Sequence, residues 1–139
     1  MVAQVFLLLA GAHRKLKEYP QAIRSAQEGL GILEKANDPH VDSALRELGR
    51  DYLEQGRPAK AEPYLRRSFE IRRQQLPPTH LDLAKIELTL ARCLSELGRA
   101  AEAESLLRRA EPIVRRQAAS AADQVQEIQA LKARLQGRR

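Results

Sequence analysis

A twelve-residue pattern that occurs twice, 42 residues apart, constrains this chain more than any other feature. The copies span residues 56–67 and 98–109, and both read G-R-x-x-x-A-E-x-x-L-R-R. Recurrence at such a period is the signature of a repeat array. Gly56 and Gly98 suit the left-handed position just beyond a helix end, which glycine adopts without steric strain. An apolar-periodic segment lies on each side of each glycine, so the predicted unit is helix, tight turn, helix.

This unit resembles the tetratricopeptide repeat (TPR), a helix pair of about 34 residues. The matching residues of the middle unit are Leu48, Gly49, Tyr52, Gly56, Ala61 and Leu65. Those of the last unit are Leu90, Ala91, Leu94, Gly98, Ala103, Leu107 and Ala110. In this family, small residues such as those at Gly49 and Ala61 let the two helices of a unit approach closely. The resemblance implies a right-handed α-solenoid that serves as a platform for binding proteins, and a fold alone does not specify the ligand.

The longer period is similar to a TPR variant found in kinesin light chains and many bacterial signalling proteins. That variant has an extended second helix and a linker that reads roughly His-Pro-Asp-Val. Here residues 38–41 read Asp-Pro-His-Val and residues 80–83 read His-Leu-Asp-Leu, so His and Asp are exchanged in the first linker. Arginine outnumbers lysine, which also hints at a bacterial source.

The chain is predicted to be a single all-α domain, residues 1–139, because helix-forming residues dominate and β-branched residues are scarce. The predicted helices are residues 2–18, 20–36, 41–55, 58–75, 81–97, 100–117 and 120–136. The predicted units are a divergent first repeat at 1–37, a second repeat at 38–78, a third at 79–118, a capping helix at 119–136 and a tail at 137–139. The capping helix has one apolar stripe and one polar face, as expected of the helix that closes a repeat array.

The first predicted helix is apolar on every face over about two turns, which is typical of a helix that is buried all round. Val5, Leu7 and Leu8 form its predicted packing or self-association edge. Four occupants remain open for this edge: an earlier repeat of a longer protein, a second copy of the chain, another partner, or the second helix of the same repeat.

No catalytic, cofactor or metal site is predicted, because the chain has no phosphate-binding loop, nucleophile signature or metal-ligand spacing. His40 and His80 lie close to acidic residues, which would suit either a catalytic base or a helix N-cap, and the N-cap is favoured. The single Cys93 excludes an internal disulfide and indicates a reducing, cytoplasmic setting. No apolar run reaches the roughly 20 residues of a membrane-spanning helix.

The net charge is +6, so the partners considered are acidic proteins and nucleic acids. The first helix of each TPR unit is expected to line a concave groove. The predicted groove residues are Arg14, Lys15, Arg46, Arg50, Lys85, Leu88 and Arg92. A basic groove with an apolar patch suits an acidic peptide or protein segment, held by arginine forks. The sequence therefore predicts a non-enzymatic interaction module.

Two alternatives remain open. The chain could be a C-terminal structural or self-association segment of a larger bacterial signalling protein, for which the apolar first helix is the evidence. It could also bind RNA through arginine pairs on the second helices, by neutralising phosphates. Those pairs are Arg66–Arg67, Arg72–Arg73, Arg108–Arg109 and Arg115–Arg116. Nearby glutamates offset part of this charge and the chain has few aromatic residues for base stacking, so RNA is the less favoured alternative.

Overall fold

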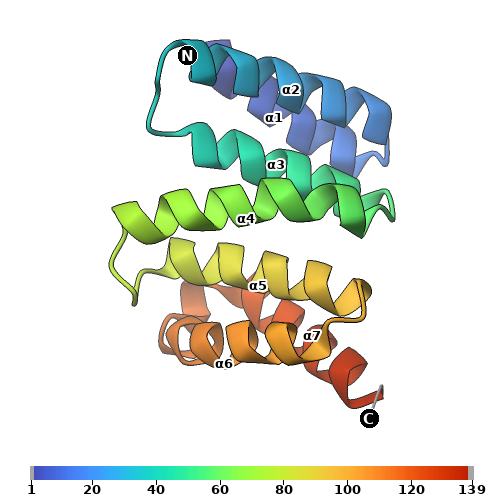
Figure 1. The fold of residues 1–139 in the computed structure, drawn as a ribbon, viewed down its shortest axis with the longest axis vertical. Coiled ribbons are helices and arrows are strands. Elements are labelled where there is room, and N and C mark those ends of the chain that lie inside the picture. Colours follow the sequence, from blue (N-terminus) through green and yellow to red (C-terminus); the bar gives the residue numbers. More distant parts are fainter. Residues whose placement is uncertain (1, 138–139) are drawn as a thin grey trace. The chain divides into compact units, whose positions relative to one another are not determined.

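The computed structural model describes residues 2–137, which are almost entirely helical and contain no strand (Figure 1). The elements in order are α1 (Val2–Lys15), α2 (Tyr19–Lys35), α3 (Val41–Glu54), α4 (Pro58–Gln75), α5 (Leu81–Glu96), α6 (Ala100–Arg116), a short 3-10 helix (Ala118–Ser120) and α7 (Ala122–Gly137). The predicted all-α class and the predicted series of helices are confirmed. None of these helices is long and apolar enough to cross a membrane.

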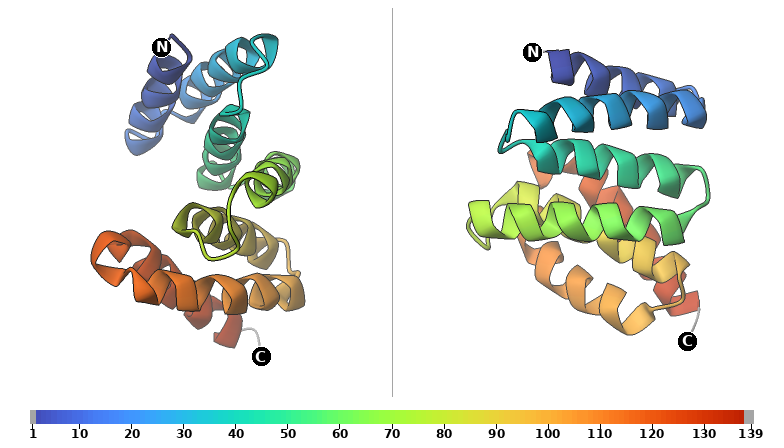
Figure 2. Two further views of the ribbon diagram at one scale, coloured as in Figure 1. Left: turned by 90° about the vertical axis from the view of Figure 1, so that its left-hand side faces the viewer. Right: turned by 45° about the horizontal axis from the view of Figure 1, so that its top comes forward.

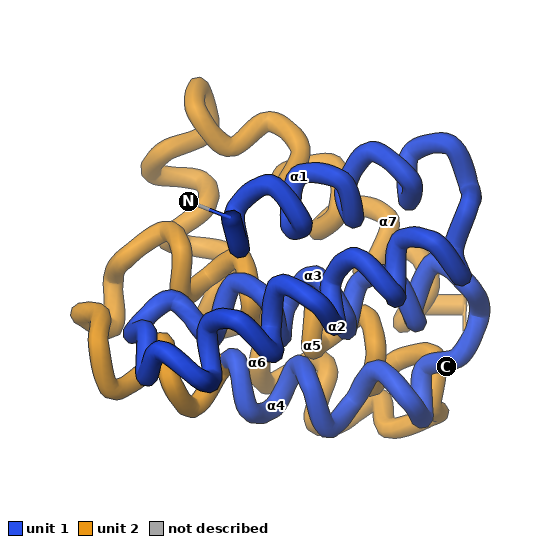
Figure 3. The backbone as a smooth tube through the Cα atoms, turned by 90° about the horizontal axis from the view of Figure 1, so that it is seen from above, with its two compact units in different colours: residues 1–68 blue, residues 69–139 orange. Residues whose placement is uncertain are grey.

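The chain divides into two compact units, residues 1–68 and residues 69–139 (Figure 3). The boundary falls within α4, which runs without a break across it. The first unit therefore contains α1, α2, α3 and most of α4, and the second contains the end of α4 and everything after it. This boundary lies inside the predicted second repeat and does not coincide with a junction between repeats. The division into three repeats therefore stays a prediction.

In the first unit, α2 packs against α1 on one side and α3 on the other (Figures 1 and 2). Small side chains allow the close approach of α1 and α2, and Ala10, Ala22 and Ala26 are fully buried. A methyl group added at Gly29 would lie 3.0 Å from Leu7 Cδ2. Leu7 thus packs between α1 and α2, whereas the sequence placed it on the exposed edge of α1.

Helices α3 and α4 pack closely at Gly49, a small residue that the repeat pattern indicated. A Cβ atom at Gly49 would lie 2.4 Å from Leu65 Cδ2, a separation that side chains do not tolerate. The rings of Tyr52 and Tyr64 stack nearby, with centroids 5.8 Å apart. The predicted role of Gly49 in close helix packing is therefore confirmed.

Three helix pairs are joined by the same kind of turn. The residue in the left-handed conformation is Gly56 with φ 81°, Gly98 with φ 80° and Lys17 with φ 62°. At each turn, this residue donates its N–H to the carbonyl three residues earlier, and the next residue donates to the carbonyl five residues before it. This is the Schellman arrangement, which satisfies the last carbonyls of a helix. The first repeat therefore uses the same turn as the others, although its left-handed residue carries a side chain.

The second unit is built around α5, most of whose residues are buried. Both α6 and α7 pack against α5, and α7 also packs against α6. The predicted apolar stripe of α7 faces inward, because Ile128, Leu131 and Leu135 are buried. Glu87 on α5 is also buried, and Arg109 Nε on α6 lies 3.3 Å from its Oε2 atom. Burial raises the pKa of Glu87, and Arg109 opposes part of that effect.

Candidate protein-binding surface

Arg14, a predicted groove residue, is engaged within the chain. Its Nη1 atom lies 2.6 Å from Glu47 Oε2 and 2.8 Å from Asp51 Oδ1, both on α3. The Arg14 side chain is only 10% exposed and that of Asp51 is fully buried. This three-residue ion-pair group ties α1 to α3, so Arg14 holds the fold together and has little surface left for a ligand.

The ionisation of this group follows from its burial. Burial raises the pKa of Asp51 to about 6, against the lowering effect of the Arg14 guanidinium. Burial also lowers the pKa of Arg14, but Glu47 and Asp51 outweigh that effect and hold this pKa above its usual value. Arg14 therefore stays charged, whereas Asp51 titrates just below neutral pH.

A basic pocket of about 290 Å³ lies at the C-terminal ends of α1 and α3. Its lining residues are Arg14, Lys15, Lys17, Tyr19, Arg50 and Glu54. Within residues 2–137, Lys15, Lys17 and Arg50 form no ion pair. The structure thus brings the predicted residues Lys15 and Arg50 together and adds Lys17, whose position depends on the left-handed turn.

Arg46 is placed differently from Arg50. It is half-buried, its Nε atom is buried, and it does not line this basic pocket. The sequence expected Arg46 and Arg50 to act together because they are four residues apart on one helix. In the structure only Arg50 reaches the pocket, and Arg46 has interactions within the chain.

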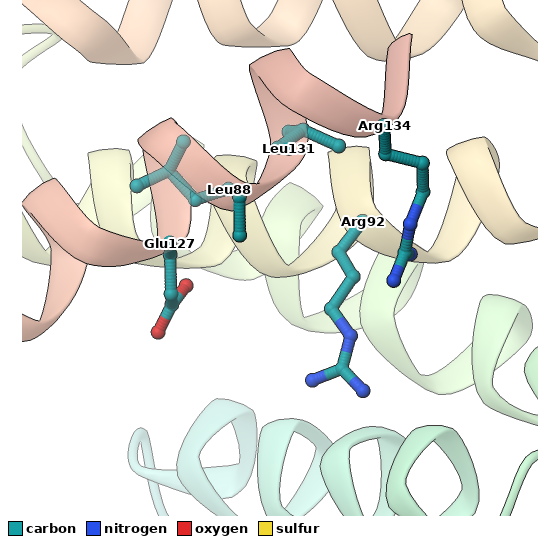
Figure 4. Close-up of a pocket in the computed structure, with 6 residues that line it drawn as sticks. Leu88, Arg92, Glu127, Leu131 and Arg134 are labelled. Atoms are coloured by element: carbon teal, nitrogen blue, oxygen red, sulfur yellow. The ribbon is translucent and has the colours of Figure 1, made fainter. Parts of the chain in front are cut away.

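A second pocket, of about 220 Å³, lies in the second unit between α5 and α7. Its lining residues are Leu88, Arg92, Glu127, Ala130, Leu131 and Arg134. Figure 4 shows Glu127 at one end and the two arginine side chains at the other. Arg92 Nε and Arg134 Nη1 lie 3.8 and 3.6 Å from the two carboxylate oxygens of Glu96. The pocket therefore combines an apolar wall with two arginines that share one carboxylate.

The sequence identified two of the residues of this second pocket, Leu88 and Arg92. It missed Glu127 and Arg134 because the polar face of α7 was expected to be solvated. These two residues are seven apart and so lie on one face of a helix, which was the signal available. Lys85 does not line the pocket, and its Nζ atom lies 4.0 Å from Asp82 Oδ1.

The histidines serve local structure. His80 Nδ1 accepts a hydrogen bond from the backbone N–H of Asp82 and so caps α5, as the N-cap interpretation expected. In the linker before α3, His40 Nδ1 lies 2.8 Å from Asp38 Oδ1. Among residues 2–137, no group of three or more His, Cys, Asp or Glu side chains could hold a metal ion.

The sequence matches a family model described as tetratricopeptide repeat, over residues 1–74 and again over residues 40–116. Together these matches cover most of the chain. The chain belongs to the tetratricopeptide-repeat family. TPR units of this kind generally mediate protein–protein interaction or scaffolding, and the TPR fold is typically non-catalytic. A search of curated proteins gave no match.

Solved TPR structures have the same fold. BtubC (BKLC) from P. vanneervenii is 24% identical with a TM-score of 0.72, over 81% of this chain and 46% of that one. A putative kinesin light chain from Podosopora anserina with nearly identical TPR-like repeats is 21% identical with a TM-score of 0.74, over 95% of this chain and 72% of that one. A point variant of that light chain gives a TM-score of 0.73. The chain thus spans about half the length of BtubC, and identities this low bear on the fold alone.

Several arginines of the four Arg–Arg pairs on α4 and α6 form ion pairs with acidic side chains. Arg66 Nε lies 2.7 Å from Glu62, and Arg115 Nη2 lies 2.7 Å from Glu111. Arg73 Nη2 lies 2.9 Å from Glu70. These glutamates therefore offset part of the positive charge of the arginine pairs, as their spacing predicted.

Proposed function

We propose that this TPR chain binds an acidic peptide or protein segment of a partner through the first helices of its repeats. The observation that carries the proposal is the basic pocket at the ends of α1 and α3. Lys15, Lys17 and Arg50 converge there, and none of the three forms an ion pair among residues 2–137. Such a group of cations attracts a carboxylate more strongly than cations that are already paired.

The chemistry of the pocket favours carboxylates on a peptide. Arg50 can donate two parallel hydrogen bonds to one carboxylate, whereas Lys15 and Lys17 act as point charges that tolerate several ligand positions. Tyr19 adds an aromatic ring beside them, and Glu54 disfavours a ligand carboxylate at its own end of the pocket. The ligand is therefore a segment with Asp or Glu side chains on one side.

The pocket between α5 and α7 supports the same ligand class. Leu88, Ala130 and Leu131 offer an apolar wall for an aliphatic side chain. Arg134 contacts one carboxylate oxygen of Glu96 through Nη1, and its guanidinium has further N–H donors for a ligand carboxylate. A peptide that pairs an acidic residue with a leucine or isoleucine would match this second unit.

The experiment uses the full chain and a fluorescent pool of peptides built from Asp, Glu, Leu and Ala, with a second pool in which Asn and Gln replace Asp and Glu. We expect the acidic pool alone to bind, with an affinity that falls as salt rises. Lys15→Glu combined with Arg50→Glu should weaken this binding at least about tenfold, because it replaces two attractive charges with repulsive ones.

The matched control is Lys60→Glu combined with Arg24→Glu. It makes the same change in net charge on the second helices, outside the basic pocket. We expect this control to keep most of the binding, and circular dichroism should confirm that both variants remain helical. Equal binding of the two peptide pools, or unchanged binding by the pocket variant, would contradict the proposal.

A further inference from the structure

One face of α1, at the edge of the first unit, is apolar and uncovered (Figure 2). Its members, all exposed, are Val2, Val5, Leu8, Leu9, Ala12 and Leu16. The five large ones are between 43% and 75% exposed, and within residues 2–137 no other large apolar side chain is exposed. A contiguous patch of this kind marks an interaction surface.

The same positions are covered in the other two repeats. At an offset of 39 residues, Val2, Val5 and Leu9 correspond to Val41, Ala44 and Leu48 on α3. A further 42 residues on, the corresponding residues of α5 are Leu83, Ile86 and Leu90. Five of these six are buried, and Val41 is half-buried. The apolar face is thus a packing face, and only on α1 does it lack a cover.

The second helix of the first repeat covers the N-terminal half of this face on α3. Leu33 of α2 belongs to one buried cluster with Ala44, and Leu30 and Val41 pack against that cluster. Leu30 and Leu33 are three residues apart and so lie on the same side of α2. The cover of this half is therefore a helix that presents two leucines at that spacing.

The first helix of the same repeat covers the C-terminal half, where Arg14 of α1 binds Glu47 and Asp51. On α1 the positions of these two acids are Leu8 and Ala12, at the same offset of 39 residues. An arginine placed on them would lose its water and find no carboxylate, which is costly. A helix pair that covers α1 should therefore carry an apolar residue where α1 itself carries Arg14.

A second copy of the chain offers neither contact. In each copy, the side of α2 that carries Leu30 and Leu33 already packs on α3. The first helix of each copy carries Arg14, which does not match Leu8 and Ala12. The two contacts that cover α3 therefore select a helix pair from outside this chain.

We propose that this face of α1 docks a TPR-type helix pair of a partner, in the way that the first repeat packs on α3. The partner's second helix places two leucine-sized residues, three apart, over Val2 and Val5. Its first helix places an apolar residue over Leu8 and Ala12. None of the six residues of the face lines the basic pocket or the α5–α7 pocket, so this docking is independent of peptide binding.

The test supplies such a helix pair as an extension of the full chain. A second copy of residues 2–40 is placed directly before Val2, with Arg14→Leu in the added copy. The added sequence ends in the linker that joins α2 to α3, so it can pack on α1 as the first repeat packs on α3.

The measurement is the rate at which a thiol reagent labels Val5→Cys of the original α1. The natural cysteine, Cys93, is buried, so the new thiol reacts first. We expect the extension to slow labelling at least about tenfold, because the thiol is then reached only through local opening. The matched control is Gln27→Cys on the exposed side of α2, which should react equally fast with and without the extension.

A charge exchange tests the apolar requirement. An added copy that keeps Arg14 should protect the Val5→Cys thiol less than the copy with Arg14→Leu. Leu8→Glu combined with Ala12→Asp in the original α1 should reverse this order, because it recreates the acids that Arg14 binds on α3.

Three results would refute the proposal. Equal labelling of Val5→Cys with and without the extension would show that the face does not accept a helix pair. Equal protection by both added copies would remove the apolar requirement. A dimer of the unextended chain in light scattering at about 500 µM, abolished by Val5→Glu, would show that a second copy occupies the face.

Discussion

Arg14 on α1 and Asp51 on α3 form an ion pair with 2.8 Å between Nη1 and Oδ1, at a place where the Asp51 side chain is fully buried. Removing one partner leaves a buried charge uncompensated. We expect Arg14→Met to lower the free energy of unfolding by about 3 kcal/mol at pH 7. Arg14→Met combined with Asp51→Leu should be less destabilising than Arg14→Met alone, because it removes the orphaned carboxylate. Urea unfolding of the three proteins measures this, and a larger loss in the double variant would contradict it.

The raised pKa of Asp51 predicts an unusual pH dependence. Since burial raises this pKa from 3.8 to about 6, the folded chain binds more protons than the unfolded chain between these values. The contribution of Asp51 to stability is therefore fully present below about pH 4 and is lost as pH rises through 6. Between pH 7 and pH 4, we expect wild type to gain about 2 kcal/mol relative to Asp51→Asn.

The comparison with Asp51→Asn is needed because other carboxylates work in the opposite direction. Hydrogen bonding to Lys132 lowers the pKa of Glu111, so protonation of Glu111 at acid pH destabilises the fold in both proteins. Only the difference between the two unfolding free energies isolates Asp51. A difference that does not vary between pH 4 and pH 7 would show that Asp51 has an ordinary pKa.

The close packing at Gly49 predicts that a methyl group added there destabilises the fold. Because a Cβ atom there would lie 2.4 Å from Leu65 Cδ2, Gly49→Ala should destabilise the chain by about 1–3 kcal/mol through overpacking. Gly31 in the middle of α2 is the matched control, since a Cβ atom added there would have no neighbour within 4 Å. Gly31→Ala should stabilise the chain by about 0.5–1 kcal/mol through helix propensity. Thermal unfolding of both variants checks the opposite signs.

The helices and their turns could be predicted from the sequence because repeat spacing and helical periodicity are local signals. Gly56 and Gly98 adopt positive φ, and Gly49 contacts Leu65, as the repeat pattern implied. The first helix was harder, because apolar residues on all its faces do not show which face is covered. Leu7 therefore seemed equivalent to Leu8, although Leu7 packs against Gly29 and Leu8 is exposed.

The candidate binding residues were predicted less completely. Whether a cation is already engaged in an ion pair, or lines a pocket, depends on residues far away in the sequence. Arg14 pairs with Glu47 and Asp51, more than thirty residues away in sequence, and no local pattern indicates that pairing. Arg134 belongs to a pocket only because α7 packs against α5. A sequence can show which cations share a helix face, but it does not show which of them are already neutralised.

Lys17 links the stability of the first turn to the proposed binding pocket. It holds φ 62° at a position where the other two turns have glycine, and the left-handed conformation is strained for a residue with a side chain. Lys17→Gly should therefore raise the free energy of unfolding by about 1 kcal/mol. The same change removes a cation from the basic pocket, so we expect it to weaken binding of the acidic peptide pool. Gly98→Ala makes the reverse exchange at an equivalent turn outside the pocket, and it should lower stability and leave binding unchanged. A Lys17→Gly variant that gains stability and binds as well as wild type would show that the lysine is no part of the binding site.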